Sequence, residues 1–137
     1  MSYSDPLVNQ TYQLASHDFG AGAGTNSFKA PAGFTRGRIT DIGVGNITEA
    51  FASVTTAGQV QLGDGTDVDK YAQLEVANGT GSGIGDTYNV RNDSNAIIEA
   101  DILVSDLTGG QLEFTYVAPT GGTPAGIGEP YVTIDWF

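Results

Sequence analysis

Side chains suited to catalysis near neutral pH are scarce in this chain. General acid–base catalysis uses titratable groups with pKa values close to the working pH, most often histidine. The 137 residues include one histidine, His17, and no cysteine. His17 could work with Asp18 or Asp41, but no Gly-x-Ser-x-Gly turn is present to supply a nucleophilic serine. We therefore expect His17 to be an exposed polar residue, and we predict a protein without catalytic residues that is not an enzyme.

The segment Gln61–Leu74 concentrates carboxylates that could bind a hard cation. Asp64, Asp67 and Asp69 occupy relative positions one, four and six. A Ca²⁺-binding EF-hand loop needs oxygen ligands at positions one, three and five, with a glycine at six and a glutamate at twelve. The spacing favours a polar turn in which Asp67 caps a short helix that runs to Leu74. We predict no metal and no other cofactor.

A second group of carboxylates has the residue types used in glycoside hydrolysis. Glu99, Asp101 and Glu113 fall on the predicted outward faces of neighbouring strands, and such enzymes use a pair of carboxylates. A sugar site would also need an exposed aromatic ring, whereas Trp136 falls on an alternating, core-facing pattern. The pattern therefore favours a structural role for these acids.

Two glycine-rich segments, Gly20–Gly24 and Gly79–Gly85, carry little side-chain surface. Phosphate-binding loops also contain closely spaced glycines, but they lead into a helix, and Pro31 lies too near for a helix after Gly24. Neither segment can offset its ordering entropy by burying side chains. We expect both to be mobile loops unless a partner holds them.

The elements that position these residues are predicted to be short strands. Leu112, Phe114 and Tyr116 alternate with polar residues, and this period of two is typical of an antiparallel sheet with one buried face. Val132 and Trp136, with the isoleucine between them, continue the pattern near the C-terminus. The predicted strands cover 11–14, 27–29, 36–44, 49–54, 59–62, 73–76, 96–105, 111–118 and 131–137.

Together these strands indicate one all-β domain over residues 1–137, an antiparallel two-sheet sandwich with long Gly-rich loops. Eight or nine short strands favour a jelly-roll-like arrangement. The segment Leu107–Gly110 is predicted to be a hairpin loop that joins the two longest strands. Residues Met1–Gln10 lack clear alternation and are predicted to form an N-terminal arm.

Charge limits the classes of partner. Five Lys and Arg residues against sixteen Asp and Glu residues give a formal net charge of −11. Nucleic-acid affinity depends on cationic contacts to phosphate, so we expect no nucleic acid and no anionic membrane surface as a partner. No signal peptide and no membrane-spanning segment are expected from the sequence. The charge favours solubility and a partner with basic patches.

Four stretches of the chain carry a resemblance to a known class of protein. They are Gly37–Val44 with Glu49–Phe51, Val60–Gly63 with Asp67–Leu74, Val117–Gly126, and Val132–Phe137. These stretches resemble small virion proteins of tailed bacteriophages, in particular capsid decoration (cement) proteins.

The resemblance implies a β-sandwich or jelly roll that binds the major capsid protein on the outer surface of the virion and stabilises the capsid. It also implies a homotrimer without cofactors, made in the cytoplasm of the host bacterium. Candidate contacts follow from exposure, and they are the Met1–Gln10 arm and the loops Gly20–Gly24 and Gly79–Gly85.

Two other functions fit the same sequence. One is a tail or fibre component that recognises a host surface, and the other is a carbohydrate-binding β-sandwich module. Association with intact heads would favour the capsid role, and binding of glycans would favour the carbohydrate module.

Removal of metal ions should not destabilise the protein, because the carboxylates around Asp64 lack the spacing of a cation site. Thermal unfolding in EDTA and in millimolar Ca²⁺ should give the same midpoint. A large Ca²⁺-dependent rise in the midpoint would contradict this prediction, since a ligand that binds only the folded state stabilises it.

Overall fold

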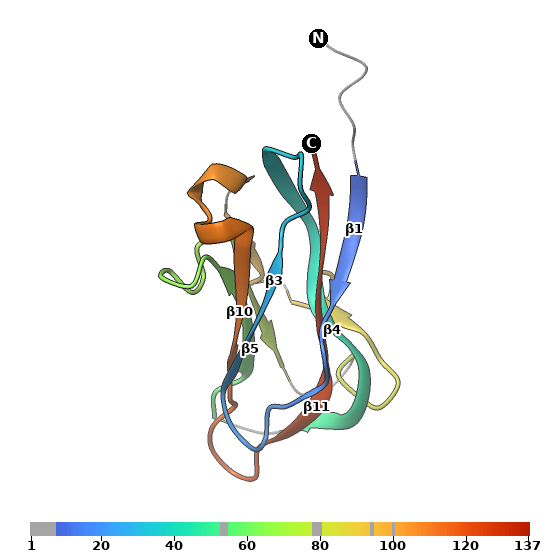
Figure 1. Cartoon of the computed structure of the whole chain (residues 1–137). Helices are drawn as coiled ribbons and strands as arrows, with labels where there is room; N and C mark the ends of the chain where they lie inside the picture. The colour runs from blue at the N-terminus through green and yellow to red at the C-terminus, as the bar shows by residue number, and fades with distance from the viewer. Residues whose placement is uncertain (1–7, 53–54, 78–80, 94, 100) are drawn as a thin grey trace.

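The chain folds into two antiparallel sheets that pack face to face (Figure 1). The computed structural model describes residues 8–52, 55–77, 81–93, 95–99 and 101–137. This architecture confirms the predicted all-β, two-sheet sandwich.

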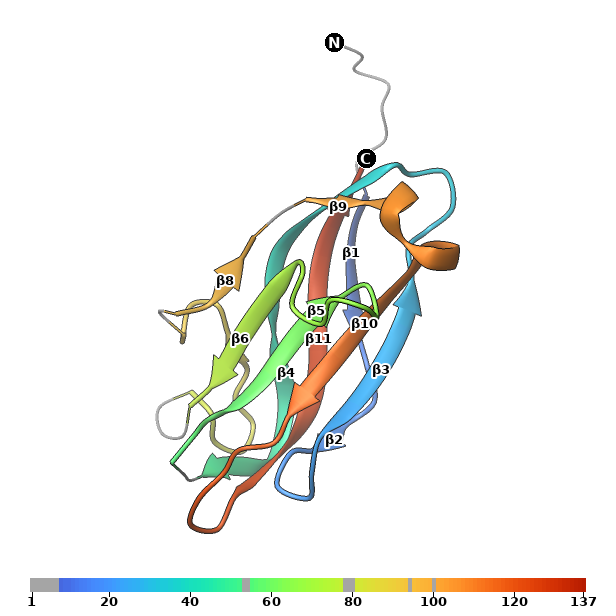
Figure 2. The ribbon, with the colours of Figure 1, turned by 90° about the vertical axis from the view of Figure 1, so that its left-hand side faces the viewer.

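Sheet A has the strand order β1-β11-β4-β7, with the short strand β2 paired to β11 and β9 paired to β4. Its strands are β1 (Val8–Gln13), β2 (His17–Asp18), β4 (Arg36–Ala52), β7 (Tyr88–Asn89), β9 (Ile102–Leu103) and β11 (Ala125–Trp136). Sheet B has the order β3-β10-β5-β6-β8 and faces the viewer in Figure 2. Its strands are β3 (Gly24–Lys29), β5 (Gly58–Gly63), β6 (Ala72–Val76), β8 (Ile97–Ile98) and β10 (Gln111–Val117).

The connections give the sandwich its topology. The chain crosses between the sheets from β2 to β3, from β3 to β4, from β4 to β5 and from β10 to β11, whereas β5 and β6 form a hairpin within sheet B. As a result, the last strand lies between the first and the fourth. This is the strand order of a jelly roll, as the sequence predicted.

The predicted alternation decides which side chains enter the core. Leu112 and Phe114 of β10, and Val132, Ile134 and Trp136 of β11, all have an exposed fraction of 0%. The C-terminal segment is therefore a buried strand, which confirms the prediction from its alternating pattern.

Aromatic rings form a continuous row through the core. Neighbouring ring centroids lie 4.4–6.5 Å apart. Tyr12 stacks on Phe28 at 4.4 Å, and its hydroxyl accepts a 2.9 Å hydrogen bond from Nε1 of Trp136. In order, the row is Trp136, Tyr12, Phe28, Phe114, Tyr116, Phe19 and Phe51. Because its members come from both sheets, the row joins the two layers.

The prediction of a long strand over 96–105 is wrong. Ile97 and Ile98 form β8 at the edge of sheet B, and the chain then crosses to sheet A, where Ile102 and Leu103 form β9. The alternating pattern therefore spans two sheets, and Ile98 is 42% exposed whereas Ile102 is buried.

The predicted hairpin at Leu107–Gly110 is also wrong. Two 3₁₀ turns, η1 (Val104–Asp106) and η2 (Thr108–Gly110), carry the chain from β9 in sheet A to β10 in sheet B. The two longest strands are β4 and β11, which pair with each other.

Three strands are longer than their patterns predicted. β4 runs from Arg36 to Ala52 through the predicted gap between 44 and 49, and β11 begins at Ala125 rather than at Tyr131. Glycines interrupt the apolar pattern at both places, although they do not interrupt the strands. β1 begins at Val8, so residues 8–10 of the predicted arm are paired to β11, and residues 1–7 lie outside the described residues.

Two glycines of β4 should respond in opposite ways to an added methyl group. A Cβ at Gly37 would lie 2.5 Å from Cζ3 of Trp136 and 2.9 Å from Cγ2 of Ile134. A Cβ at Gly45 would meet its nearest neighbour at 3.6 Å, which is ordinary van der Waals contact. We expect Gly37→Ala to lower the free energy of unfolding by about 1–3 kcal/mol through overpacking.

Gly45→Ala is the matched control and should change the free energy of unfolding by less than about 0.5 kcal/mol. Urea unfolding of both variants measures the difference. Equal stability of the two variants would show that Trp136 does not pack on β4 as described.

Candidate functional site

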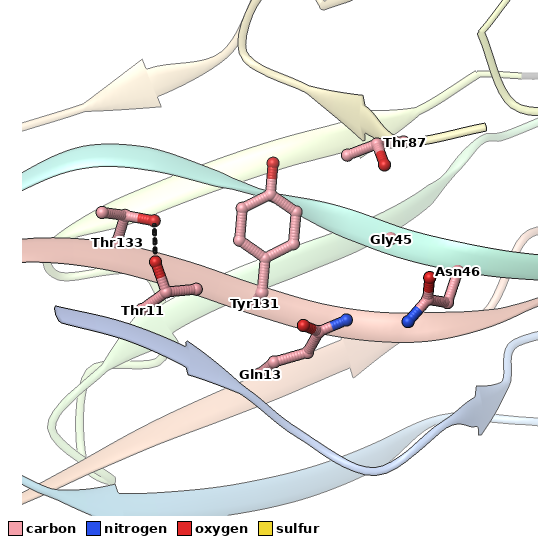
Figure 3. Close-up of a pocket in the computed structure, with 7 residues that line it drawn as sticks. All are labelled: Thr11, Gln13, Gly45, Asn46, Thr87, Tyr131 and Thr133. Atoms are coloured by element: carbon pink, nitrogen blue, oxygen red, sulfur yellow. Dashed lines mark hydrogen bonds between the residues drawn. The ribbon is translucent and has the colours of Figure 1, made fainter.

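The outer face of sheet A, which points away from sheet B, carries a concavity of about 280 Å³. Figure 3 shows its lining, with Tyr131 at the centre and polar side chains on either side. The lining residues are Thr11, Gln13, Gly45, Asn46, Thr87, Tyr131 and Thr133. They come from β1, β4, β11 and the residue before β7.

Strand register brings these residues together. Thr11 pairs with Thr133, and Gln13 pairs with Tyr131, across β1 and β11. Residues two apart in a strand point to the same face, so all four side chains lie on the outer face of sheet A. Val132, between the two β11 residues, points into the core with an exposed fraction of 0%. The same alternation therefore builds both the core and the concavity.

Glu129 holds two amide side chains of the concavity in place. Its Oε2 accepts hydrogen bonds of 2.6 Å from Nε2 of Gln13 and from Nδ2 of Asn46. Asn46 has a φ of 45°, in the left-handed region that asparagine tolerates better than most residues. The amides are thus oriented before any ligand arrives, which lowers the entropy cost of using them.

Two more hydrogen bonds orient the rest of the lining. The hydroxyls of Thr11 and Thr133 lie 2.8 Å apart, and the hydroxyl of Tyr131 donates to Oδ2 of Asp41 at 2.8 Å. Burial raises the pKa of Tyr131 to about 12, and the bond to Asp41 acts in the same direction. Tyr131 therefore stays protonated near neutral pH. The other oxygen of Asp41, Oδ1, is buried and makes no hydrogen bond to the described residues.

This arrangement is suited to binding a polar molecule. Threonine hydroxyls and side-chain amides donate and accept hydrogen bonds but do not titrate near neutral pH. The concavity therefore has the groups to orient a ligand through hydrogen bonds.

In the structure, His17 and the two aspartates considered beside it, Asp18 and Asp41, each have other partners. The ring of His17 lies between Phe19 and Tyr116, with centroid distances of 4.8 and 4.7 Å, and its Nε2 lies 2.9 Å from the carbonyl oxygen of Gly22. His17 is thus partly buried rather than exposed, which corrects the prediction. Asp18 accepts a hydrogen bond from the backbone of Ala21 instead.

The acidic loop before β6 contains turns and no helix, so the predicted helix capped by Asp67 is wrong. Asp64 is the residue that caps the turn, because its Oδ1 accepts hydrogen bonds of 2.9 Å from the backbone N–H groups of Thr66 and Asp67. These bonds and the nearby Lys70 ammonium lower the pKa of Asp64 to about 2. Among the described residues, no group of three or more His, Cys, Asp and Glu side chains could hold a metal ion.

The second predicted group of carboxylates is dispersed, so the placement of Glu99, Asp101 and Glu113 on neighbouring strands is wrong. Glu99 follows β8, Glu113 lies on β10, and two strands separate β8 from β10 in sheet B. Asp101 lies next to sheet A and pairs with Arg38 at 3.5 Å. These carboxylates are dispersed because the chain crosses from sheet B to sheet A after Ile98.

The glycine-rich segments are held by local hydrogen bonds. Within Gly20–Gly24, the carbonyl oxygen of Gly22 contacts His17, as described above. In the described part of the second segment, Gly81–Gly85, the backbone N–H of Gly85 donates to Ile47 of β4 at 2.8 Å. Ile84 in that segment is 74% exposed. Residues 79 and 80 lie outside the described residues.

Comparison of the chain with protein-family models, with curated proteins and with solved structures found no match. Within the part of the chain that the structure describes, no helix is long and apolar enough to span a membrane.

Sequence reasoning did not find the concavity. Its residues are threonines and amides scattered from Thr11 to Thr133, and no local motif links them. The available signal was the polar half of the alternating strand patterns, but it becomes informative only when the order β1-β11-β4 is known.

The buried phenol of Tyr131 should make stability fall at alkaline pH. Its pKa is raised from 10.0 to about 12 in the folded state, so the folded state binds more protons than the unfolded chain between these values. The stabilisation is complete below pH 10 and is lost as the pH rises toward 12. Tyr131→Phe should lower stability at neutral pH by about 1–3 kcal/mol, because Asp41 loses its donor.

The same variant should lose less stability than the wild type between pH 10 and 12, since one late-titrating phenol is gone. Urea unfolding at a series of pH values measures both effects. Identical pH dependence in the two proteins would contradict the assignment. Tyr116, whose pKa is also raised to about 12 by burial, accounts for part of the slope that remains.

Proposed function

We propose that this protein is a capsid decoration (cement) protein of a tailed bacteriophage, which binds the major capsid protein on the outer surface of the virion and stabilises the capsid. It is made in the cytoplasm of the host bacterium and acts as a homotrimer. The resemblance in the sequence supports this role, and the jelly-roll sandwich is compatible with it.

The observation that carries the proposal is the exposed side chain of Ile84, in the loop between β6 and β7. Its side chain is 74% exposed, more than any other large hydrophobic side chain among the described residues. Burial of an isoleucine against a partner contributes about 1.5–3 kcal/mol. Its exposure leaves this side chain available for burial against a partner.

Hydrogen bonds attach the loop around Ile84 to β4 and stabilise its turn. The N–H of Gly85 donates to the carbonyl of Ile47 at 2.8 Å, and the N–H of Phe51 donates to the carbonyl of Ser82 at 3.0 Å. Asp86 also accepts a bond from the backbone of Gly83 at 3.0 Å. Gly85 has a φ of 83°, which few residues other than glycine adopt readily. A loop fixed in advance loses little entropy when it binds.

The net charge of the chain and the several copies of the loop in the proposed trimer support the same role. The net charge of −11 keeps the free protein soluble and favours contact with basic patches of a partner. In a trimer, three copies of the loop would engage one shell of capsid subunits. Linked contacts can raise the overall affinity by about 10²–10⁴ over one contact.

The proposal is tested with Ile84→Ser on purified heads that lack accessory proteins. Loss of the apolar contact should reduce binding about tenfold or more, whereas the melting temperature should stay the same because the side chain is exposed. Val68→Ser is the control, because Val68 is 39% exposed and lies in the loop at the opposite end of β6. Its occupancy should equal that of the wild type.

Bound copies are counted by gel densitometry or electron microscopy, and sedimentation measures the oligomer. Failure of the wild type to bind heads would overturn the capsid role. Equal occupancy by Ile84→Ser would remove the loop from the contact. A monomer at all concentrations would refute the trimer.

A further inference from the structure

We infer that the concavity around Tyr131 is a binding site for a neutral saccharide, with a single sugar ring as the bound unit. The inference concerns the isolated protein and does not rest on the capsid role. Four observations carry it: the size of the concavity, the types of side chain that line it, their orientation by neighbouring bonds, and the charges around it.

The size of the concavity restricts the ligand. Its volume of about 280 Å³ is near the lower limit of small-molecule sites, which span about 300–1,000 Å³. A site of this size suits one sugar ring better than a dinucleotide or a folded peptide. Gly45 contributes no side chain, and its nearest lining atoms would be 3.6–3.9 Å from an added Cβ. The absence of a side chain there gives a ligand room beside Tyr131.

The lining has the hydrogen-bonding groups that a polyol needs. Each sugar hydroxyl both donates and accepts, and threonine hydroxyls do the same. Thr11 and Thr133 supply one pair of such groups, and Thr87 supplies another hydroxyl on the opposite side of Tyr131 (Figure 3). The amides of Gln13 and Asn46 add donors and acceptors of fixed geometry.

The orientation of these groups is set before binding. A single oxygen of Glu129 anchors both amides at 2.6 Å through their nitrogens, so that their oxygens are free to accept bonds from ligand hydroxyls. Tyr131 is fixed by its bond to Asp41, and its side chain lines the concavity between the polar groups. Binding therefore requires little rearrangement of the side chains.

The surrounding charges select against anionic sugars. Glu129 and Asp41 bond directly to lining residues, while Arg91 is the cation that acts on Tyr131. With two carboxylates and one guanidinium, the rim of the concavity has a negative net charge. The whole molecule is also negative, with a net charge of −11. A uronic acid or a phosphorylated sugar would be repelled, whereas a neutral sugar would not.

The inference is tested by NMR titration of the ¹⁵N-labelled full chain with glucose, galactose, mannose and N-acetylglucosamine, and with glucuronate as the anionic counterpart. At least one neutral sugar should cause saturable shifts at Thr11, Gln13, Gly45 and Asn46, with a Kd of about 1 mM. Glucuronate should bind at least about tenfold more weakly than the neutral sugar that binds best.

Gly45→Ala is the main variant, because its methyl group fits the fold and occupies the concavity. It should weaken sugar binding about tenfold while the backbone spectrum stays that of the wild type. Thr11→Val is a second variant, which replaces the hydroxyl next to Thr133 by a methyl group and should also weaken binding.

Asn9→Ala is the matched control. It breaks a similar amide–carboxylate bond, from Asn9 to Asp135 at 2.7 Å, on the same face but outside the concavity. Its affinity should equal that of the wild type. The absence of saturable shifts with every neutral sugar, shifts confined to another surface, or unchanged affinity in Gly45→Ala would each overturn the inference.

Discussion

Antiparallel pairing between β4 and β11 in the middle of sheet A determines which side chains of these strands point into the core and which line the concavity. The pairing runs from Gly37 opposite Trp136 to Ala52 opposite Ala125, with register shifts near Ile127 and Thr133. On one face it delivers Val132, Ile134 and Trp136 to the core. On the other face it places polar residues around Tyr131. A shift of the register by one residue would exchange the two faces, so the core and the concavity exist only together.

The row of aromatic rings explains how the open side of the sandwich is closed. β1 and β3 are edge strands of different sheets and do not pair with each other through backbone hydrogen bonds. Tyr12 of β1 and Phe28 of β3 stack at 4.4 Å across this gap. The bond from Trp136 to the hydroxyl of Tyr12 then ties the edge to the central strand β11. Side-chain packing thus replaces the ladder that a closed barrel would have there.

Local alternation was sufficient to predict the fold class and the buried residues of β10 and of β11 from Val132 on, because each of these segments has one buried and one polar face. It failed between Ala96 and Ser105, where two short strands from different sheets happen to continue one pattern. Glycines hid the true length of β4 and β11, since a glycine has no side chain to mark a face. The sequence did not predict the concavity, because its residues meet only through long-range strand pairing. Polar residues of these types are also common on any exposed strand.

The pairing of β1 with β11 joins residues that are 126 positions apart, such as Asn9 and Asp135. A ribosome makes the chain from the N-terminus at about 5–20 residues per second, so β1 emerges many seconds before its partner exists. During that interval β1 and β4 both lack the strand that lies between them in sheet A. The sandwich can therefore close only after translation has passed Trp136. Chains released early would keep unpaired strand edges, and cellular proteases and chaperones could distinguish them from finished molecules by that exposure.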